Sequence, residues 1–157
     1  MSKGKIVSFE TTREVHDRCL CFAAQRAARA LARRFDAALR PVGLTSGQYS
    51  LLMSLNQPAP PTLGSVADLL GMDRTTLTAN LKPLLRNGWA NSAVDPDDRR
   101  GRRLSLTAKG RKVLTAALPI WRRTHAEIDA ALPPPLAPRA LQAGLRALAV
   151  PEGVAGR

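Results

Sequence analysis

One stretch of the sequence, residues 71–88, most constrains the fold, because it has the pattern of a single short helix with both ends marked. Asp73 predicts the helix N-terminus, since its carboxylate can accept hydrogen bonds from the unpaired amides of the first turn. Gly88 predicts the end, because glycine readily adopts the left-handed conformation that follows many helices. Between them, leucines recur at the spacing of one helical face. The predicted buried row is Leu77, Leu81, Leu84 and Leu85.

The opposite face of this predicted helix is polar and has no acidic residue between Arg74 and Asn87. It combines short hydroxyls, an amide and long cations, which can hydrogen-bond phosphate oxygens and base edges. A helix with such a front is suited to a DNA groove. The residues of this front are Arg74, Thr75, Thr78, Asn80, Lys82 and Arg86.

The residues before this stretch predict a helix-turn-helix. A short amphipathic helix is expected over residues 63–70, with Thr62 as its N-cap. The turn between the two helices contains Gly71, and two helices joined in this way form a helix-turn-helix. Further upstream, Thr45 and Gln48 have the spacing of a capping box, which predicts another helix from that point.

The residues after this stretch predict a β-hairpin with a basic tip. Residues 89–94 and 104–106 have the pattern of strands, and residues 95–98 have the composition of a turn. From Arg99 to Lys112 there are seven Lys and Arg residues and no acid. A charge run alone usually marks a solvated face, but beside a candidate recognition helix it indicates a contact with DNA. Together these elements predict a winged helix.

Amphipathic helices longer than a winged domain needs are expected at both ends of the chain, over residues 13–40, 108–132 and 136–150. So small a domain cannot bury all their apolar stripes, which predicts a two-fold homodimer. The expected fold is mainly α with a small β-hairpin wing. The expected organisation is a flexible lead-in (1–12), an N-terminal dimerisation helix (13–43), a winged helix-turn-helix DNA-binding domain (44–107), C-terminal dimerisation helices (108–150) and a flexible tail (151–157).

Composition favours a nucleic-acid partner and a cytoplasmic location. The chain has 24 Lys and Arg against 12 acids, a net charge of +12, and such an excess indicates a polyanion. No secretory signal and no membrane-spanning run is visible. Cys19 and Cys21 lie too close together to staple a fold, as suits a reducing compartment. Catalytic triads, phosphate-binding glycine loops and metal-ligand spacings are missing, so we expect no enzyme, cofactor or metal.

The order of these elements resembles the MarR family of bacterial winged-helix transcription regulators. The specific part is the Asp-Pro-x-Asp-Arg-Arg wing at residues 95–100, followed by Leu-Ser-Leu-Thr-x-x-Gly at 104–110. The resemblance covers residues 19–132. It implies a homodimer that binds a palindromic operator in double-stranded DNA, usually as a repressor. It also implies release by a small, frequently aromatic, effector or by oxidation.

The resemblance further implies roles for individual residues. Thr75 and Thr76 would hold phosphates, and the next turn would face base edges. Ala79 stands where many relatives have a large cation, so it would offer an apolar contact to a thymine methyl. Arg100 would enter the minor groove, held in place by Asp98. The full set of expected DNA-binding residues is Arg74, Thr75, Thr76, Thr78, Ala79, Asn80, Lys82, Arg86, Arg99, Arg100 and Arg102.

An effector pocket between the first, second and long helices would be lined by Phe22, Trp121 and His125. Trp121 and His125 lie four residues apart and so on one helical face, where a simple core pair is an equal interpretation.

Cys21 offers an alternative function. Its segment resembles that of the organic-peroxide-sensing branch of the family, which supports its reactive thiol with two tyrosines. Phe35 and Ser46 occupy the matching positions here, so the sequence favours a buried structural cysteine over a redox sensor. A more distant alternative is a winged-helix module for protein–protein interaction.

Overall fold

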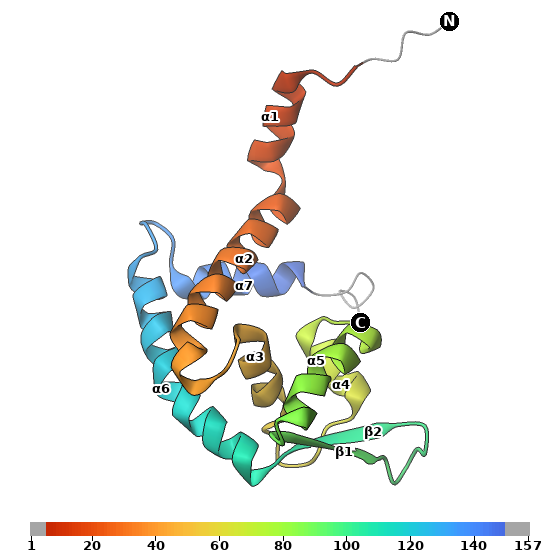
Figure 1. Cartoon of the computed structure of the whole chain (residues 1–157). Helices are drawn as coiled ribbons and strands as arrows, with labels where there is room; N and C mark the ends of the chain where they lie inside the picture. The colour runs from red at the N-terminus through yellow and green to blue at the C-terminus, as the bar shows by residue number, and fades with distance from the viewer. Residues whose placement is uncertain (1–5, 150–157) are drawn as a thin grey trace, which may run out of the picture. The chain divides into compact units, whose positions relative to one another are not determined.

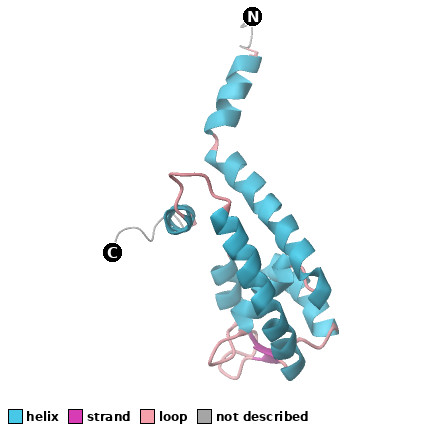
Figure 2. Ribbon diagram, turned by 90° about the vertical axis from the view of Figure 1, so that its left-hand side faces the viewer, coloured by secondary structure: helices cyan, strands magenta, loops and turns pink. Residues whose placement is uncertain are grey.

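A computed structural model describes residues 6–149, so the predicted tail and the first five residues lie outside the described part. Within that range the chain is helical apart from one two-stranded antiparallel hairpin (Figure 2), as the sequence predicted. Two compact units divide between Arg34 and Phe35. The elements are α1 (Phe9–Arg18), α2 (Leu20–Leu39), the 3-10 helix η1 (Arg40–Val42), α3 (Ser46–Leu55), α4 (Leu63–Leu70), α5 (Arg74–Arg86), β1 (Ala90–Val94), β2 (Arg102–Leu106), α6 (Ala108–Ala130) and α7 (Pro138–Leu148).

The first unit contains two helices where the sequence predicted one. Ser8 caps α1, because its Oγ accepts a hydrogen bond from the Thr11 amide at 3.2 Å. α1 therefore begins inside the segment that was expected to be a lead-in. The long helix expected over residues 13–40 is broken at Cys19, whose backbone is extended with ψ 104°. Neither proline nor glycine marks this break, so helical periodicity alone did not reveal it.

The second unit is built around a leucine-rich core shared by α3, α4, α5, α6 and the hairpin (Figure 1). Leu52 of α3, Leu77 and Leu84 of α5, and Leu104 of β2 are completely buried. Burying a leucine contributes roughly 1.5–3 kcal/mol relative to leaving it exposed. This core therefore fixes α5 against both the preceding helices and the hairpin.

The helix ends of this unit follow the predicted signals. Thr45 and Gln48 form the reciprocal capping box at the start of α3. Asp73 caps α5, with one carboxylate oxygen 2.8 Å from the Thr76 amide and the other 2.7 Å from the Thr76 hydroxyl. The hydroxyl and then the amide of Thr76 lower the pKa of the Asp73 carboxyl. Gly88 is left-handed, with φ +67°.

The last two helices are shorter than expected. α6 ends at Ala130, before the predicted end at residue 132. α7 begins at Pro138, because proline suits a first turn whose amide needs no intrahelical partner. Its apolar stripe is uncovered in the single chain, with Leu141 41% and Leu148 64% exposed. Within residues 6–149, no helix has the length and apolarity that crossing a bilayer requires.

Candidate nucleic-acid interface

α5 has the two contrasting faces that the sequence predicted, with one correction. Leu77, Leu81 and Leu84 are buried, whereas Leu85 is 38% exposed. Consecutive residues point about 100° apart around a helix, and here Leu85 points away from the face on which Leu84 is buried. All eight candidate DNA-binding residues of α5 are exposed: Arg74, Thr75, Thr76, Thr78, Ala79, Asn80, Lys82 and Arg86.

Local hydrogen bonds organise this exposed front. The Thr78 hydroxyl donates to the carbonyl oxygen of Arg74 at 2.7 Å. The side-chain amide of Asn80 lies 3.7 Å from the sulfur of Met72, which is a weak hydrogen bond. Thr76 uses both its amide and its hydroxyl on Asp73, so these donors are already engaged. A hollow of about 340 Å³ opens on the front and is lined by Arg74, Thr75, Thr78, Ala79 and Lys82.

The wing presents its arginines to solvent. β1 and β2 pair antiparallel, with Ala90 opposite Leu106 and Val94 opposite Arg102. Ala90, Leu104 and Leu106 are buried against the core. The side chains expected to contact DNA from this hairpin are exposed: Arg99, Arg100 and Arg102.

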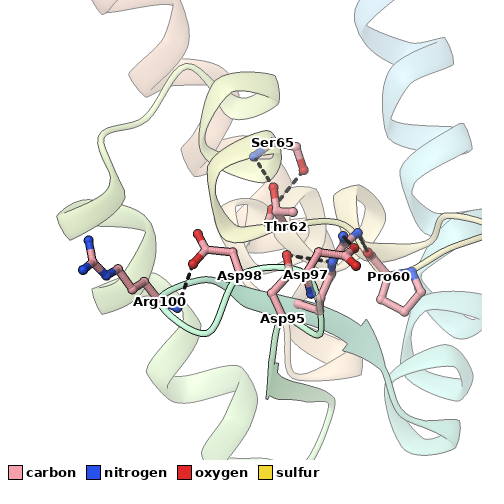
Figure 3. A network of polar contacts seen from close by, with 8 residues as sticks. Pro60, Thr62, Ser65, Asp95, Asp97, Asp98 and Arg100 are labelled. Atoms are coloured by element: carbon pink, nitrogen blue, oxygen red, sulfur yellow. Dashed lines mark hydrogen bonds and ion pairs between the residues drawn. The ribbon is translucent and has the colours of Figure 1, made fainter.

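The sequence interpretation had Asp98 holding the Arg100 side chain. In the structure Asp98 instead supports the backbone of the wing tip. Its carboxylate accepts a hydrogen bond from the Arg100 amide at 2.9 Å. Its carbonyl oxygen accepts one from the Gly101 amide at 2.8 Å. Figure 3 shows the Arg100 guanidinium extending away from Asp98. An aspartate that binds the amide two residues on is a common turn device, and here it shapes the tip.

Arg103 holds the wing in place, and sequence reasoning missed it. Its Nε lies 2.9 Å from a carboxylate oxygen of Asp95, as an ion pair without hydrogen-bond alignment. One terminal nitrogen pairs with Asp97 at 3.2 Å, and the other donates to the carbonyl oxygen of Pro60 at 3.3 Å. The hydrogen bond from the Asp97 amide, with help from Arg103, lowers the pKa of the buried Asp95 against its desolvation. The available signal was a pair of aspartates two positions apart in the turn, Asp95 and Asp97, followed by a nearby arginine.

The same region ties the wing to the helix-turn-helix. The backbone of Thr62 forms an isolated antiparallel β-bridge with Arg103 of β2. The Leu104 amide donates to the carbonyl oxygen of Pro61 at 2.9 Å. Thr62 also caps α4, because its hydroxyl accepts a hydrogen bond from the Ser65 amide at 3.0 Å. Figure 3 shows Thr62 and Ser65 close to the wing turn.

The expected effector-pocket residues belong to different units. The Trp121 and His125 rings on α6 lie 4.4 Å apart between centroids, and Trp121 also stacks on Tyr49 at 6.3 Å. Phe22 belongs to the first unit, where its ring contacts His16. A hollow of about 450 Å³ in the second unit is lined mainly by apolar side chains of α3, α4 and α6, including Tyr49 and Trp121.

The single chain contradicts the prediction of a buried structural cysteine. Cys21 is exposed, and its sulfur accepts a hydrogen bond from the side-chain amide of Gln25 at 3.2 Å. Cys19 is partly exposed and accepts from the Phe22 amide at 3.4 Å. The physical reason is that no residue of α1 or of α2 before Leu39 is buried.

This fold and interface define a winged-helix transcription regulator, and comparison with known proteins gives the family. The MarR family model matches residues 44–101. The regulator MosR of M. tuberculosis, solved in complex with DNA, is 36% identical, with a TM-score of 0.76 over 84% of this chain and 94% of that chain. The repressor CouR of Rhodococcus jostii RHA1, bound to a 23-mer DNA duplex, is 29% identical, with a TM-score of 0.74 over 87% and 96%. The chain belongs to the MarR family.

Curated relatives match over shorter lengths. The regulator TtmR of Methylorubrum extorquens (strain PA1) is 36% identical over 95 residues, which are 60% of this chain and 49% of TtmR. The chain thus spans 49% of this curated relative and 63% of another. MarR-family proteins are transcription regulators, which confirms the prediction that the chain is not an enzyme.

Proposed function

We propose that the chain is a sequence-specific DNA-binding regulator that represses transcription in the cytoplasm as a homodimer on a palindromic operator. The observation that carries this proposal is the exposed cationic and hydroxyl front of α5 beside an arginine-tipped wing. The DNA-bound structure of the 36% identical regulator MosR supports it.

The two DNA-facing elements divide the work of recognition. α5 enters the major groove, where Asn80 pairs with adenine and Lys82 with guanine. Each such pair contributes about 1–3 kcal/mol of discrimination against a wrong base. Ala79 offers its methyl group to thymine. Thr75 lies in the first turn, where helix amides and dipole favour phosphate. Arg100 on the wing enters the minor groove, whose width it reads.

The uncovered apolar stripes support the homodimer. α7 exposes Leu141 and Leu148, and α2 exposes Leu31, which is 40% accessible in the single chain. Burial of such stripes is the main driving force for protein association. The regions proposed to dimerise are residues 13–43 and 108–150. A two-fold dimer sets its recognition helices about 34–36 Å apart, in successive major grooves.

A gel-shift titration of the full chain tests DNA recognition. A palindromic duplex from the region upstream of the gene should bind more tightly than a shuffled duplex of equal length. The triple variant Arg99→Ala, Arg100→Ala, Arg102→Ala should bind more weakly. For this variant, the plot of log affinity against log salt should be less steep, by about 0.9 for each phosphate contact removed. Arg123→Ala, which removes an exposed cation of α6, should leave the slope unchanged. Equal affinity for the two duplexes would contradict the proposal.

We also propose that a small aromatic effector binds in the hollow beside Tyr49 and Trp121 and releases the DNA. Aromatic walls with a few hydroxyl groups suit such a ligand. In a Trp89→Phe variant Trp121 is the single remaining tryptophan. Titration with benzoate as a probe should therefore quench the tryptophan emission, excited selectively over tyrosine, and weaken operator binding. Benzoate that leaves both signals unchanged at millimolar concentration would contradict the effector site.

The thiol-based alternative remains a prediction that rests on the exposed Cys21. Its own unit supplies no phenol, because the single tyrosine of the chain is Tyr49, which stacks on Trp121 in the second unit. The geometry therefore favours the operator-binding function without a redox step.

A further inference from the structure

The guanidinium of Arg74, at the start of α5, lies against the backbone of Gly64 in α4. A Cβ added to Gly64 would stand 2.9 Å from Nη2, 3.6 Å from Cζ and 3.8 Å from Nε of Arg74. Three atoms of one guanidinium group thus border the space that any side chain at position 64 would need. The absence of a side chain at Gly64 leaves a space, called the berth below, that the Arg74 guanidinium occupies.

This berth lies beside the surface proposed to read DNA. Arg74 also lines the hollow on the α5 front, together with Thr75 and Lys82. An exposed arginine normally loses rotamer freedom when it binds a phosphate, which weakens binding. A side chain that already lies in its bound position loses less freedom, so a preformed berth increases affinity.

We propose that Gly64 is a positioning residue for DNA binding. Because it has no side chain, it leaves room for the Arg74 guanidinium to lie beside the α5 front, directed at a backbone phosphate. This inference rests on the proposed function. Gly64 itself touches no DNA in this proposal and acts only through Arg74.

Gly64→Ala separates thermal stability from operator affinity, which a damaged fold would lose together. Alanine is favoured over glycine in helices, and the only group it meets closely is the end of a flexible side chain. The melting temperature should therefore equal or exceed that of the unchanged chain. The Arg74 guanidinium must move, so affinity for the operator duplex should fall, by roughly two- to tenfold for the loss of one preorganised side chain.

A double-mutant cycle on the full chain tests the link to Arg74. The variants are Gly64→Ala, Arg74→Ala and the pair, with fluorescence anisotropy giving the operator affinity at several salt concentrations. Gly64→Ala should weaken binding in the unchanged chain and have no further effect once Arg74 is alanine. Gly47→Ala is the matched control, because that helical glycine has open space around it. Additive losses, or wild-type affinity in Gly64→Ala, would overturn the inference.

A measurement without DNA keeps this inference distinct from the proposed function. NMR relaxation of the Arg74 Nε–Hε group should show an ordered side chain in the unchanged protein and a mobile one in Gly64→Ala. Equal mobility in the two proteins would overturn the inference that Gly64 positions Arg74, even if operator binding is confirmed. Loss of operator preference in the unchanged chain, with the difference in Arg74 mobility present, would instead overturn the proposed function.

Discussion

Leu77→Ala is expected to lower the free energy of unfolding by about 2–5 kcal/mol. Leu77 is completely buried where α5 packs on the core, so its removal loses apolar burial and leaves a cavity. Alanine is itself a strong helix former, so the loss reports packing and not helix propensity. Urea unfolding followed by circular dichroism at 222 nm measures it, with the m-value checking that the transition stays two-state.

Leu85→Ala is the matched control, because it makes the same chemical change on the same helix at a residue that is 38% exposed. Its cost should be less than about 2 kcal/mol, since much of this side chain already contacts water. Equal costs for the two variants would contradict the burial pattern of α5. They would instead restore the row of four buried leucines that periodicity alone predicted.

Gly110→Ala is expected to destabilise the protein by about 3 kcal/mol. A Cβ at Gly110 would overlap the backbone carbonyl oxygen of Trp89. That oxygen cannot easily retreat, because it accepts a hydrogen bond from the Thr107 amide at 3.1 Å. Position 110 lies in the first turn of α6, where alanine would otherwise be favoured, so the steric clash reverses the usual sign.

Thermal unfolding of Gly110→Ala and Gly47→Ala side by side checks this expectation. Gly47 lies in the first turn of α3 with open space around it, so alanine there should be neutral or stabilising by up to about 1 kcal/mol. Equal melting temperatures for the two variants would show that the contact between α6 and Trp89 is loose. The expected loss explains the Leu-Thr-x-x-Gly pattern physically, because Thr107 caps α6 and Gly110 permits the close approach.

The helix-turn-helix could be predicted from sequence because its signals are local. Asp73, Thr62 and the Thr45 capping box each satisfy amides within three residues of their own position. Left-handed Gly88 follows the same logic at the end of α5. Such ends depend on hydrogen bonds that the neighbouring residues make whatever the rest of the chain does.

The parts that could not be predicted depend on distant partners, on missing partners, or on which of two groups of one residue makes a contact. Arg103 reaches Pro60, 43 residues away, so sequence showed only another cation in a basic run. Asp98 was correctly placed at the wing tip. The sequence did not show whether it would bind the side chain or the backbone amide of Arg100, and it binds the amide. Cys21 was expected to be a buried structural cysteine because Phe35 and Ser46 replace the two supporting tyrosines. Yet no residue of α2 before Leu39 is buried in the single chain.

The double attachment of Thr62, to α4 as its cap and to β2 as a bridge partner, sets the smallest piece that can be exchanged between related regulators. A hairpin transplanted alone would arrive without the carbonyl oxygens of Pro60 and Pro61 that Arg103 and Leu104 bind. A chimera that is to keep its wing angle must therefore carry residues 60–62 together with the hairpin. The unit to exchange in a redesign is therefore residues 60–62 with the hairpin, two segments that are separate in sequence and adjacent in space.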